Sequence, residues 1–283
     1  DLISNIRINL SAIERRTSTL TKRRSVKKDY QAAWLLKAIS LIDLTTLSGD
    51  DTSGKVERLC EKAKRPISLD LHYRLGLKQG DIQVGAVCVY HNLIKEAKKN
   101  LPNNIPVAAV STGFPAGLSS FKARKIEIKE SIKNGADEID IVINRGLVLQ
   151  HNWKKLYEEV KDFKKAAKNK HIKAILGVGD LETLRNVAKA SMVCMMAGAD
   201  FIKTSTGKEA INANLNNSLV MLRMIRQFYQ MTGKKIGFKP AGGISTAKTV
   251  IEFLILVMEE LGHEWINPKY LRIGAPSLLI DIE

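Results

Sequence analysis

The sequence predicts an α/β protein of the (β/α)8 TIM-barrel class, preceded by an N-terminal helical extension. Two observations support this prediction: strand-like and helix-like segments alternate along the chain, and there are eight of the strand-like ones. Such alternation favours parallel strands joined by right-handed crossovers, and eight units favour a closed barrel over an open sheet. A length of 283 residues is ordinary for one barrel domain.

The predicted strands are short, mostly apolar segments that alternate with helix-like stretches. They span residues 41–43, 84–89, 107–111, 138–143, 172–176, 200–204, 236–239 and 271–273. Amphipathic stretches between them predict helices over residues 55–64, 122–133, 153–167, 181–197, 215–231 and 247–261. We therefore expect residues 1–38 to form a basic helical extension and residues 39–283 to form the barrel.

Two lysines lie at the ends of two of these strands. Lys203 lies in the run FIKTSTGK, and Lys239 lies in the run GFKPAGG. A lysine has an ordinary pKa of about 10.4 and attacks a carbonyl only when burial or a second cation lowers that pKa. Either lysine alone would be read as a strand end that reaches solvent. The two together indicate a Schiff-base site.

Alternation along the strands predicts which charged side chains face the barrel interior. In the run EIDIVIN, the isoleucines share the face that meets the helices, so Asp140, Val142 and Asn144 should point inward. The same rule gives an inward set of charged residues comprising Asp43, Asp140, Lys173, Lys203 and Lys239. Two carboxylates against three lysines leave one lysine free to be neutral, which is the state that a nucleophile requires.

The net charge of +16 raises the question of a nucleic-acid partner, because clustered basic residues bind phosphate backbones. One cluster spans residues 22–28, and another spans residues 161–170 on a helix with an apolar opposite face. We expect no specific nucleic-acid partner, because a basic surface also concentrates small phosphorylated substrates. The first cluster has the composition of a nuclear-import patch, so we expect a cytoplasmic protein with a nuclear pool left open.

Other features exclude several classes of protein. Cys60, Cys88 and Cys194 have no CxxC spacing, which is typical of free buried thiols in a reducing, intracellular compartment. The five histidines show no ligand-like spacing, so we expect no metal. The N-terminal segment lacks the apolar core of a signal peptide, and no apolar run approaches the ~18 residues of a membrane span.

These runs together resemble the deoxyribose-phosphate aldolases, in particular the animal branch of that class I aldolase family. The resemblance covers residues 33–283 and includes IDLTTL, AVCVY, GFPAG and EIDIVINR beside the two lysine runs. It implies a TIM barrel that needs no cofactor. It also implies reversible cleavage of 2-deoxy-D-ribose 5-phosphate to D-glyceraldehyde 3-phosphate and acetaldehyde, in deoxyribonucleotide catabolism.

The resemblance also implies roles for individual residues. The match to Lys203 forms the imine, and the matches to Asp140 and Lys239 carry out proton transfer and activation. The matches to Asp43, Cys88 and Lys173 line the substrate site. Cys88 by itself would be read as a buried strand cysteine.

Phosphate recognition is expected at the ends of the last three strands, where barrels commonly bind it. The predicted contacts with the substrate there are Thr204, Gly207, Lys208, Gly242, Gly243, Gly274 and Ser277. Glycine lets the backbone approach an anion, and a helix beginning near Thr246 would add its N-terminus. Each glycine alone would be an ordinary turn residue.

The chain departs from the family pattern at several positions. Ser245 stands where arginine is common, and Pro276 replaces a hydroxyl residue. Residues 177–180 replace a segment that usually carries threonine and glutamate, and His91 stands where proline is frequent. These changes touch substrate and phosphate contacts and leave the imine residues intact, so they bear on affinity more than on reaction type. A non-catalytic sugar-phosphate-binding homologue is the alternative, and the nucleophilicity of Lys203 discriminates between the two. The oligomeric state, including a homo-oligomer, stays open.

Overall fold

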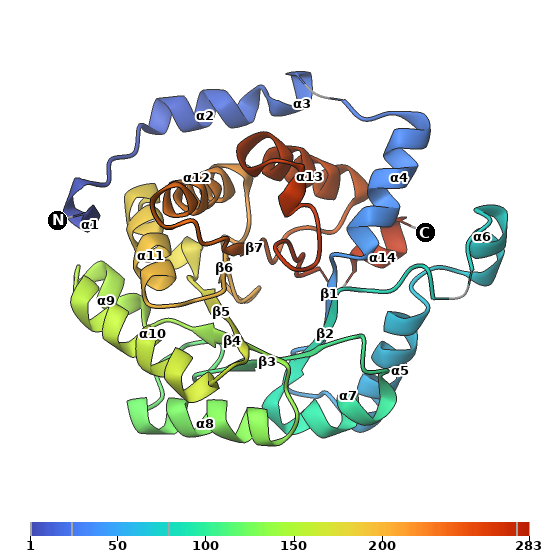
Figure 1. The fold of residues 1–283 in the computed structure, drawn as a ribbon, viewed down its shortest axis with the longest axis horizontal. Coiled ribbons are helices and arrows are strands. Elements are labelled where there is room, and N and C mark those ends of the chain that lie inside the picture. The colour runs from blue at the N-terminus through green and yellow to red at the C-terminus, as the bar shows by residue number, and fades with distance from the viewer. Residues whose placement is uncertain (1, 24, 79, 276, 283) are drawn as a thin grey trace.

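The computed structural model describes residues 2–23, 25–78, 80–275 and 277–282. A sheet of seven strands curls around the centre, and the helices lie outside it (Figure 1). The strands are β1 (Asp43–Thr45), β2 (Ala86–Tyr90), β3 (Val107–Ser111), β4 (Glu138–Val142), β5 (His171–Ile175), β6 (Phe201–Lys203) and β7 (Gly237–Lys239). Each strand pairs in parallel with the next one along the chain, which confirms the predicted βα alternation.

Residues 271–274 take the eighth position in the ring. Leu271 bridges Phe238 of β7, and Ile273 bridges Ile42 beside β1, both in parallel. The Asp43 amide donates to the Ile273 carbonyl at 2.9 Å, which closes the ring. The strand predicted over residues 271–273 therefore lies where it was expected, but it pairs through isolated bridges and not through a continuous ladder. Pro240 follows β7 and has no N–H to extend the ladder, so pairing stops at single bridges.

An outer ring of helices covers the sheet, as the amphipathic stretches predict for every member except the helix over residues 94–100. It consists of α5 (Ser53–Lys64), α7 (Ile94–Asn100), α8 (Phe121–Lys133), α10 (Trp153–Ala167), α11 (Leu184–Met196), α12 (Leu215–Thr232) and α13 (Ala247–Leu261). The bounds predicted for α10 and α13 are confirmed. The predicted helix over 181–197 begins later, because the Thr183 side chain accepts the Asn186 amide and caps α11.

Shorter helical pieces lie in the connections. They are α6 (Leu69–Arg74), α9 (Arg145–Leu149), α14 (Leu278–Ile282) and 3₁₀ turns at His91–Leu93, Val178–Asp180 and His263–Trp265. The sequence did not predict these pieces, because each is too short to show a full amphipathic period.

The apolar core lies mainly between the strands and the outer helices. Ile139, Ile141 and Ile143 of the β4 region are buried there, which confirms the predicted outward face. The barrel interior holds a second, small apolar cluster around Cys88 on β2, further buried apolar side chains such as Val142, Ile175 and Phe201, and the charged residues of the site.

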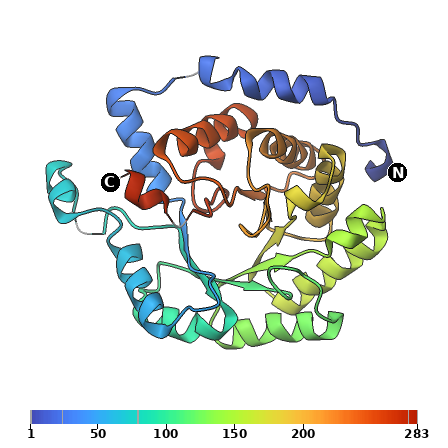
Figure 2. The same cartoon turned by 180° about the vertical axis from the view of Figure 1, so that it is seen from behind.

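The N-terminal residues form α1 (Leu2–Asn5), α2 (Leu10–Ser18), α3 (Leu20–Arg23) and α4 (Lys28–Ile39). Both views show this segment running outside the helix ring, over α12 and α13 (Figures 1 and 2). Ile13 and Leu20 are buried against the ring, and Arg16 forms an ion pair with Glu259 at 2.8 Å. Within the described ranges, no helix combines the length and apolarity that a membrane crossing requires.

Candidate active site

Asp140 on β4 is the centre of a buried charge cluster. Its Oδ2 atom accepts hydrogen bonds from the Nζ atoms of Lys203 at 2.9 Å and Lys239 at 2.8 Å. Its Oδ1 atom accepts from Lys173 Nζ at 3.0 Å. None of these four residues is more than 3% exposed. The strand register thus places β4, β5, β6 and β7 so that their inward side chains meet at one carboxylate.

Asp43 and two further residues complete the cluster. Asp43 accepts from Lys239 Nζ at 2.5 Å and from Arg272 Nη1 at 2.7 Å. Glu138 accepts from Arg272 Nη2 at 2.8 Å and also from Lys173. The inward orientation predicted for the five charged residues is confirmed.

Sequence reasoning missed Glu138 and Arg272, although the signal was present. Glu138 precedes Asp140 by two residues and so shares its face of β4. Arg272 lies between Leu271 and Ile273, whose side chains pack in the outer core. The same alternation rule, applied to every charge in the strands, identifies both residues.

The three lysines of the cluster differ in proton affinity. Burial lowers the pKa of Lys203, and the Lys239 cation lowers it further, against the opposing effect of Asp140. Burial acts in the same direction on Lys239 and Lys173, but neighbouring carboxylates outweigh it and raise the pKa of both amines. Burial alone would raise the pKa of Asp140, but the three lysines hold that pKa well below its ordinary value.

Cys88 lies fully buried on β2, near the lysines. Burial raises the pKa of its thiol, so it stays protonated and adds no charge to the site. Burial also raises the pKa of Cys60 to about 11 and that of Cys194 to about 12. All three are free and buried, as predicted.

Lys203 borders a cavity of about 450 Å³ at the carboxyl ends of the strands. Its size is typical of a small-molecule site. Six of the predicted contacts line it together, namely Gly207, Lys208, Gly242, Gly243, Gly274 and Ser277. Ser245 lines it too, whereas Pro276 falls outside the described residues.

Thr204 is not among the lining residues. Its hydroxyl accepts from the Ala241 amide at 2.9 Å and donates to the Ala241 carbonyl at 3.2 Å. The side chain therefore ties β6 to the segment after β7. Asn144, which was expected to point inward, instead caps α9 by accepting the Gly146 amide. The inward rule fails there because β4 ends at Val142.

Not all the amides expected to bind phosphate are available. The Gly274 amide donates to Pro240 at 2.9 Å, and the Gly242 amide donates to Gly274 at 3.3 Å. Among the described residues, the amides of Gly207 and Gly243 have no protein acceptor. The first amide of α13, at Ala247, donates to Asp281 at 2.6 Å, so this amide is not available to an anion.

An acidic residue holds the loop that carries Gly207 and Lys208. Glu209 accepts from the Thr206 amide at 3.0 Å and from the Thr206 hydroxyl at 2.7 Å. Arg145 lies 3.7 Å from Glu209 and pairs with Asp180 at 3.1 Å, within the segment that departs from the family pattern. These contacts connect the loops after β4, β5 and β6.

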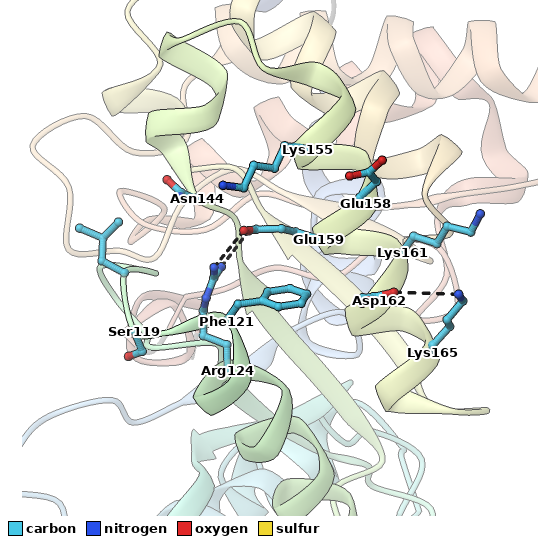
Figure 3. A pocket seen from close by; sticks show the side chains of 11 residues that line it. Ser119, Phe121, Arg124, Asn144, Lys155, Glu158, Glu159, Lys161, Asp162 and Lys165 are labelled. Carbon is cyan, nitrogen blue, oxygen red and sulfur yellow. Dashed lines mark hydrogen bonds and ion pairs between the residues drawn. The ribbon is translucent and has the colours of Figure 1, made fainter.

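A larger cavity of about 660 Å³ lies outside the barrel, between α8 and α10 (Figure 3). Arg124 crosses it to pair with Glu159 through two bonds of 3.0 and 3.2 Å. None of the inward charged residues lines this groove. We therefore place the chemistry at the smaller cavity. In the part of the chain that the structure describes, no cluster of His, Cys, Asp and Glu side chains could hold a metal ion.

Comparison with known proteins gives matches over most of the chain. Residues 37–268 match the model of a family described as DeoC/LacD family aldolase. The chain is 55% identical over 284 residues to the deoxyribose-phosphate aldolase of Homo sapiens, covering 99% of this chain and 89% of the relative.

Two solved structures are similar in fold. A structure from Toxoplasma gondii ME49 superposes with a TM-score of 0.77 at 22% identity, covering 91% of this chain and 96% of that one. A deoxyribose phosphate aldolase from Aeropyrum pernix, described as having a unique tetrameric structure, superposes with a TM-score of 0.60 at 19% identity and 94% coverage of both chains.

Proposed function

The chain belongs to the DeoC/LacD aldolase family, and from this premise we propose that it cleaves 2-deoxy-D-ribose 5-phosphate reversibly into D-glyceraldehyde 3-phosphate and acetaldehyde. The family confirms that the chain is an aldolase. The human relative, which is 55% identical, is named deoxyribose-phosphate aldolase. The observation that supports the mechanism is Lys203, a buried lysine with a lowered pKa that borders the cavity.

In the synthetic direction, the neutral Nζ atom of Lys203 attacks the carbonyl carbon of acetaldehyde. Loss of water then gives a protonated imine, whose positive nitrogen acidifies the adjacent methyl group. Asp140 lies 2.9 Å from this nitrogen and Lys239 shares the same carboxylate oxygen, so the pair is placed to remove that proton through a water molecule. The resulting enamine attacks the second aldehyde and forms the carbon–carbon bond. Hydrolysis releases the product and neutral Lys203.

The groups at the rim of the cavity favour a phosphorylated substrate. The uncommitted amides of Gly207 and Gly243 lie with Lys208, Ser245 and Ser277 around one opening. Amides and an ammonium group suit an anion. The substrate-binding roles of these residues are part of the proposal.

A non-catalytic sugar-phosphate binder is not favoured. Such a protein has no use for a lysine that is buried against Asp140 and has a lowered pKa. The relative at 55% identity is an aldolase by name. The discriminating property is therefore the nucleophilicity of Lys203.

Borohydride reduction in the presence of acetaldehyde tests the mechanism. We expect an ethyl group on Lys203, found by peptide mass mapping, together with loss of activity. Lys203→Met should abolish the label, whereas Lys208→Met should retain it, because Lys208 lies on the exposed rim. A label on Lys173 or Lys208 in the unmodified sequence, or no label, would overturn the assignment.

Three lesser expectations are proposals of the same kind. The tetrameric relative from Aeropyrum pernix supports a homo-oligomer for this chain, which light scattering would measure. The cytoplasmic location with an open nuclear pool, and the lack of a specific nucleic-acid partner, rest on composition alone. The division of the chain near residue 38 rests on the change from basic extension to strands.

A further inference from the structure

The buried cluster contains one more basic than acidic group. The acidic members are Asp43, Glu138 and Asp140, and the basic members are Lys173, Lys203, Lys239 and Arg272. All seven are at most 5% exposed, so water screens them poorly. The Cys88 thiol, which faces the same lysines, adds no charge because burial raises its pKa. A buried cluster with uncompensated charge is costly, so one basic group should lose its proton.

Arg272 cannot be that group, because a guanidinium keeps its proton in proteins. It donates to Asp43 at 2.7 Å and to Glu138 at 2.8 Å, and its Nε atom donates to the Pro268 carbonyl at 2.5 Å. The guanidinium of Arg272 thus always balances one of the three carboxylate charges. The remaining two charges can match only two of the three lysines.

Geometry selects which lysine is left over. Lys173 contacts Glu138, Asp140 at 3.0 Å and Asp43 at 3.8 Å. Lys239 contacts two carboxylates, Asp43 and Asp140. Among the described residues, Lys203 contacts a single carboxylate, that of Asp140. Lys203 is therefore the least stabilised cation of the three.

We propose that Arg272 is a positioning residue that sets the proton count of the cluster, and so leaves Lys203 neutral and able to form the imine. It acts through Asp43 and Lys239, which reach Lys203 by way of Asp140, and it is not among the residues that line the cavity. This inference rests on the proposed function of Lys203. Removing Arg272 would leave three carboxylates and three lysines, and Lys203 could then keep its proton without leaving an uncompensated charge.

The same excess charge also favours the next step. A protonated imine on Lys203 restores the fourth positive charge of the cluster. Loss of a proton from the methyl carbon gives a neutral enamine and removes that charge again. Arg272 therefore favours both the free amine and the enamine, through one electrostatic effect.

The rate of borohydride trapping by acetaldehyde, measured against pH, tests this role. Arg272→Met should raise the pH midpoint of labelling at Lys203, and each unit of the rise should slow labelling at neutral pH about tenfold. Arg272→Lys keeps a cation and should move the midpoint less. Lost packing alone would lower the amplitude of labelling and leave the midpoint in place.

Two further variants should first reverse the direction of the midpoint shift and then cancel the shift. Glu138→Gln removes a carboxylate, which leaves two acidic and four basic groups, so the midpoint should fall. The double variant Arg272→Met with Glu138→Gln has two carboxylates and three lysines, an excess of one again. Its midpoint should return toward that of the unmodified sequence, which general damage to the barrel would not produce.

Arg124→Met is the matched control, because Arg124 also forms a buried bidentate ion pair, with Glu159, but outside the barrel (Figure 3). Its midpoint should be unchanged even if its stability falls. Failure to label the unmodified sequence would refute the proposed function itself. Normal labelling there, with an unmoved midpoint in Arg272→Met, would refute only the role of Arg272. If Arg272→Met does not fold, a midpoint that rises or stays fixed in Glu138→Gln refutes it.

Discussion

At the scale of single residues, the site depends on how many carboxylates each lysine can reach. Lys203 and Lys239 are directly paired in the β6–β7 register, yet burial and carboxylates shift their pKa values in opposite directions. The difference arises because Lys239 reaches Asp43 as well as Asp140. Two chemically identical side chains therefore acquire different roles from one additional contact.

Ser245 is the residue whose substitution best tests the phosphate end of the cavity. An arginine there can donate to phosphate, and a hydrogen bond to a charged group contributes about 1.5–3 kcal/mol. Because position 245 is exposed, we expect the lower end of this range. Ser245→Arg should lower KM for deoxyribose 5-phosphate about tenfold relative to unphosphorylated deoxyribose, with kcat nearly unchanged.

Ser119→Arg is the control for added charge, because Ser119 lines the outer groove and not the site. It should leave the ratio of the two KM values unchanged. An unaltered ratio in Ser245→Arg would mean that position 245 does not face the phosphate.

At the scale of elements, β6 and β7 fit together because Gly237 lacks a side chain. A Cβ atom at position 237 would lie 2.3 Å from the Phe201 ring, which fills the barrel interior beside it. The paired positions two residues further along are Lys203 and Lys239. Packing at the base of these strands thus fixes the spacing of the two amines.

Gly237→Ala should therefore be destabilising and should also disturb the site. We expect the free energy of unfolding to fall by about 1–3 kcal/mol through overpacking, with slower trapping at Lys203. Denaturant unfolding and the trapping rate measure the two effects. Adding Phe201→Leu should recover much of the stability, because it opens space for the new methyl group.

Gly54→Ala serves as the comparison, because an added Cβ in α5 meets nothing closer than 3.7 Å. It should leave stability unchanged or raise it slightly, since alanine is the better helix former. Equal stability for Gly237→Ala and the unmodified sequence would show that Phe201 moves aside without cost.

Sequence reasoning was accurate where a local rule decides the structure. The alternation of Ile139 and Ile141 fixed the inward face of β4, and the same rule could have found Glu138 and Arg272. Sequence reasoning failed where contacts from segments far away in the chain determine the local structure. The α13 start is occupied by Asp281 from the C-terminal helix, and no pattern near Thr246 indicates that contact. The eighth strand likewise depends on where its neighbours stop.

At the scale of the whole molecule, the N-terminal extension packs against the helix ring instead of the site. Buried side chains, among them Ile13 and Leu20, attach it to the ring, and the Thr17 hydroxyl donates to Asn216 at 2.5 Å. None of the residues that line the cavity belongs to it. Its contribution should therefore be to stability and not to chemistry.

Removing residues 1–23 tests this separation. Burying an aliphatic side chain contributes about 1.5–3 kcal/mol, so losing several of them should lower the free energy of unfolding by several kcal/mol. Trapping at Lys203 in the folded enzyme should keep its pH midpoint. Glu14→Ala, at an exposed position of α2, should leave the unfolding transition in place. A shifted midpoint in the shortened chain would show that the extension influences the site.

The ion pair between Asp43 and Arg272 joins positions 229 residues apart, and this separation affects when the enzyme becomes active. A ribosome makes the chain from its N-terminus, so Asp43 and the lysines emerge well before the guanidinium that completes their cluster. Until then the cluster is open to water, where a lysine keeps its ordinary pKa of about 10.4 and stays protonated. The proposed role of Arg272 therefore predicts that the reactive amine appears only when synthesis has passed residue 272 and the ring has closed.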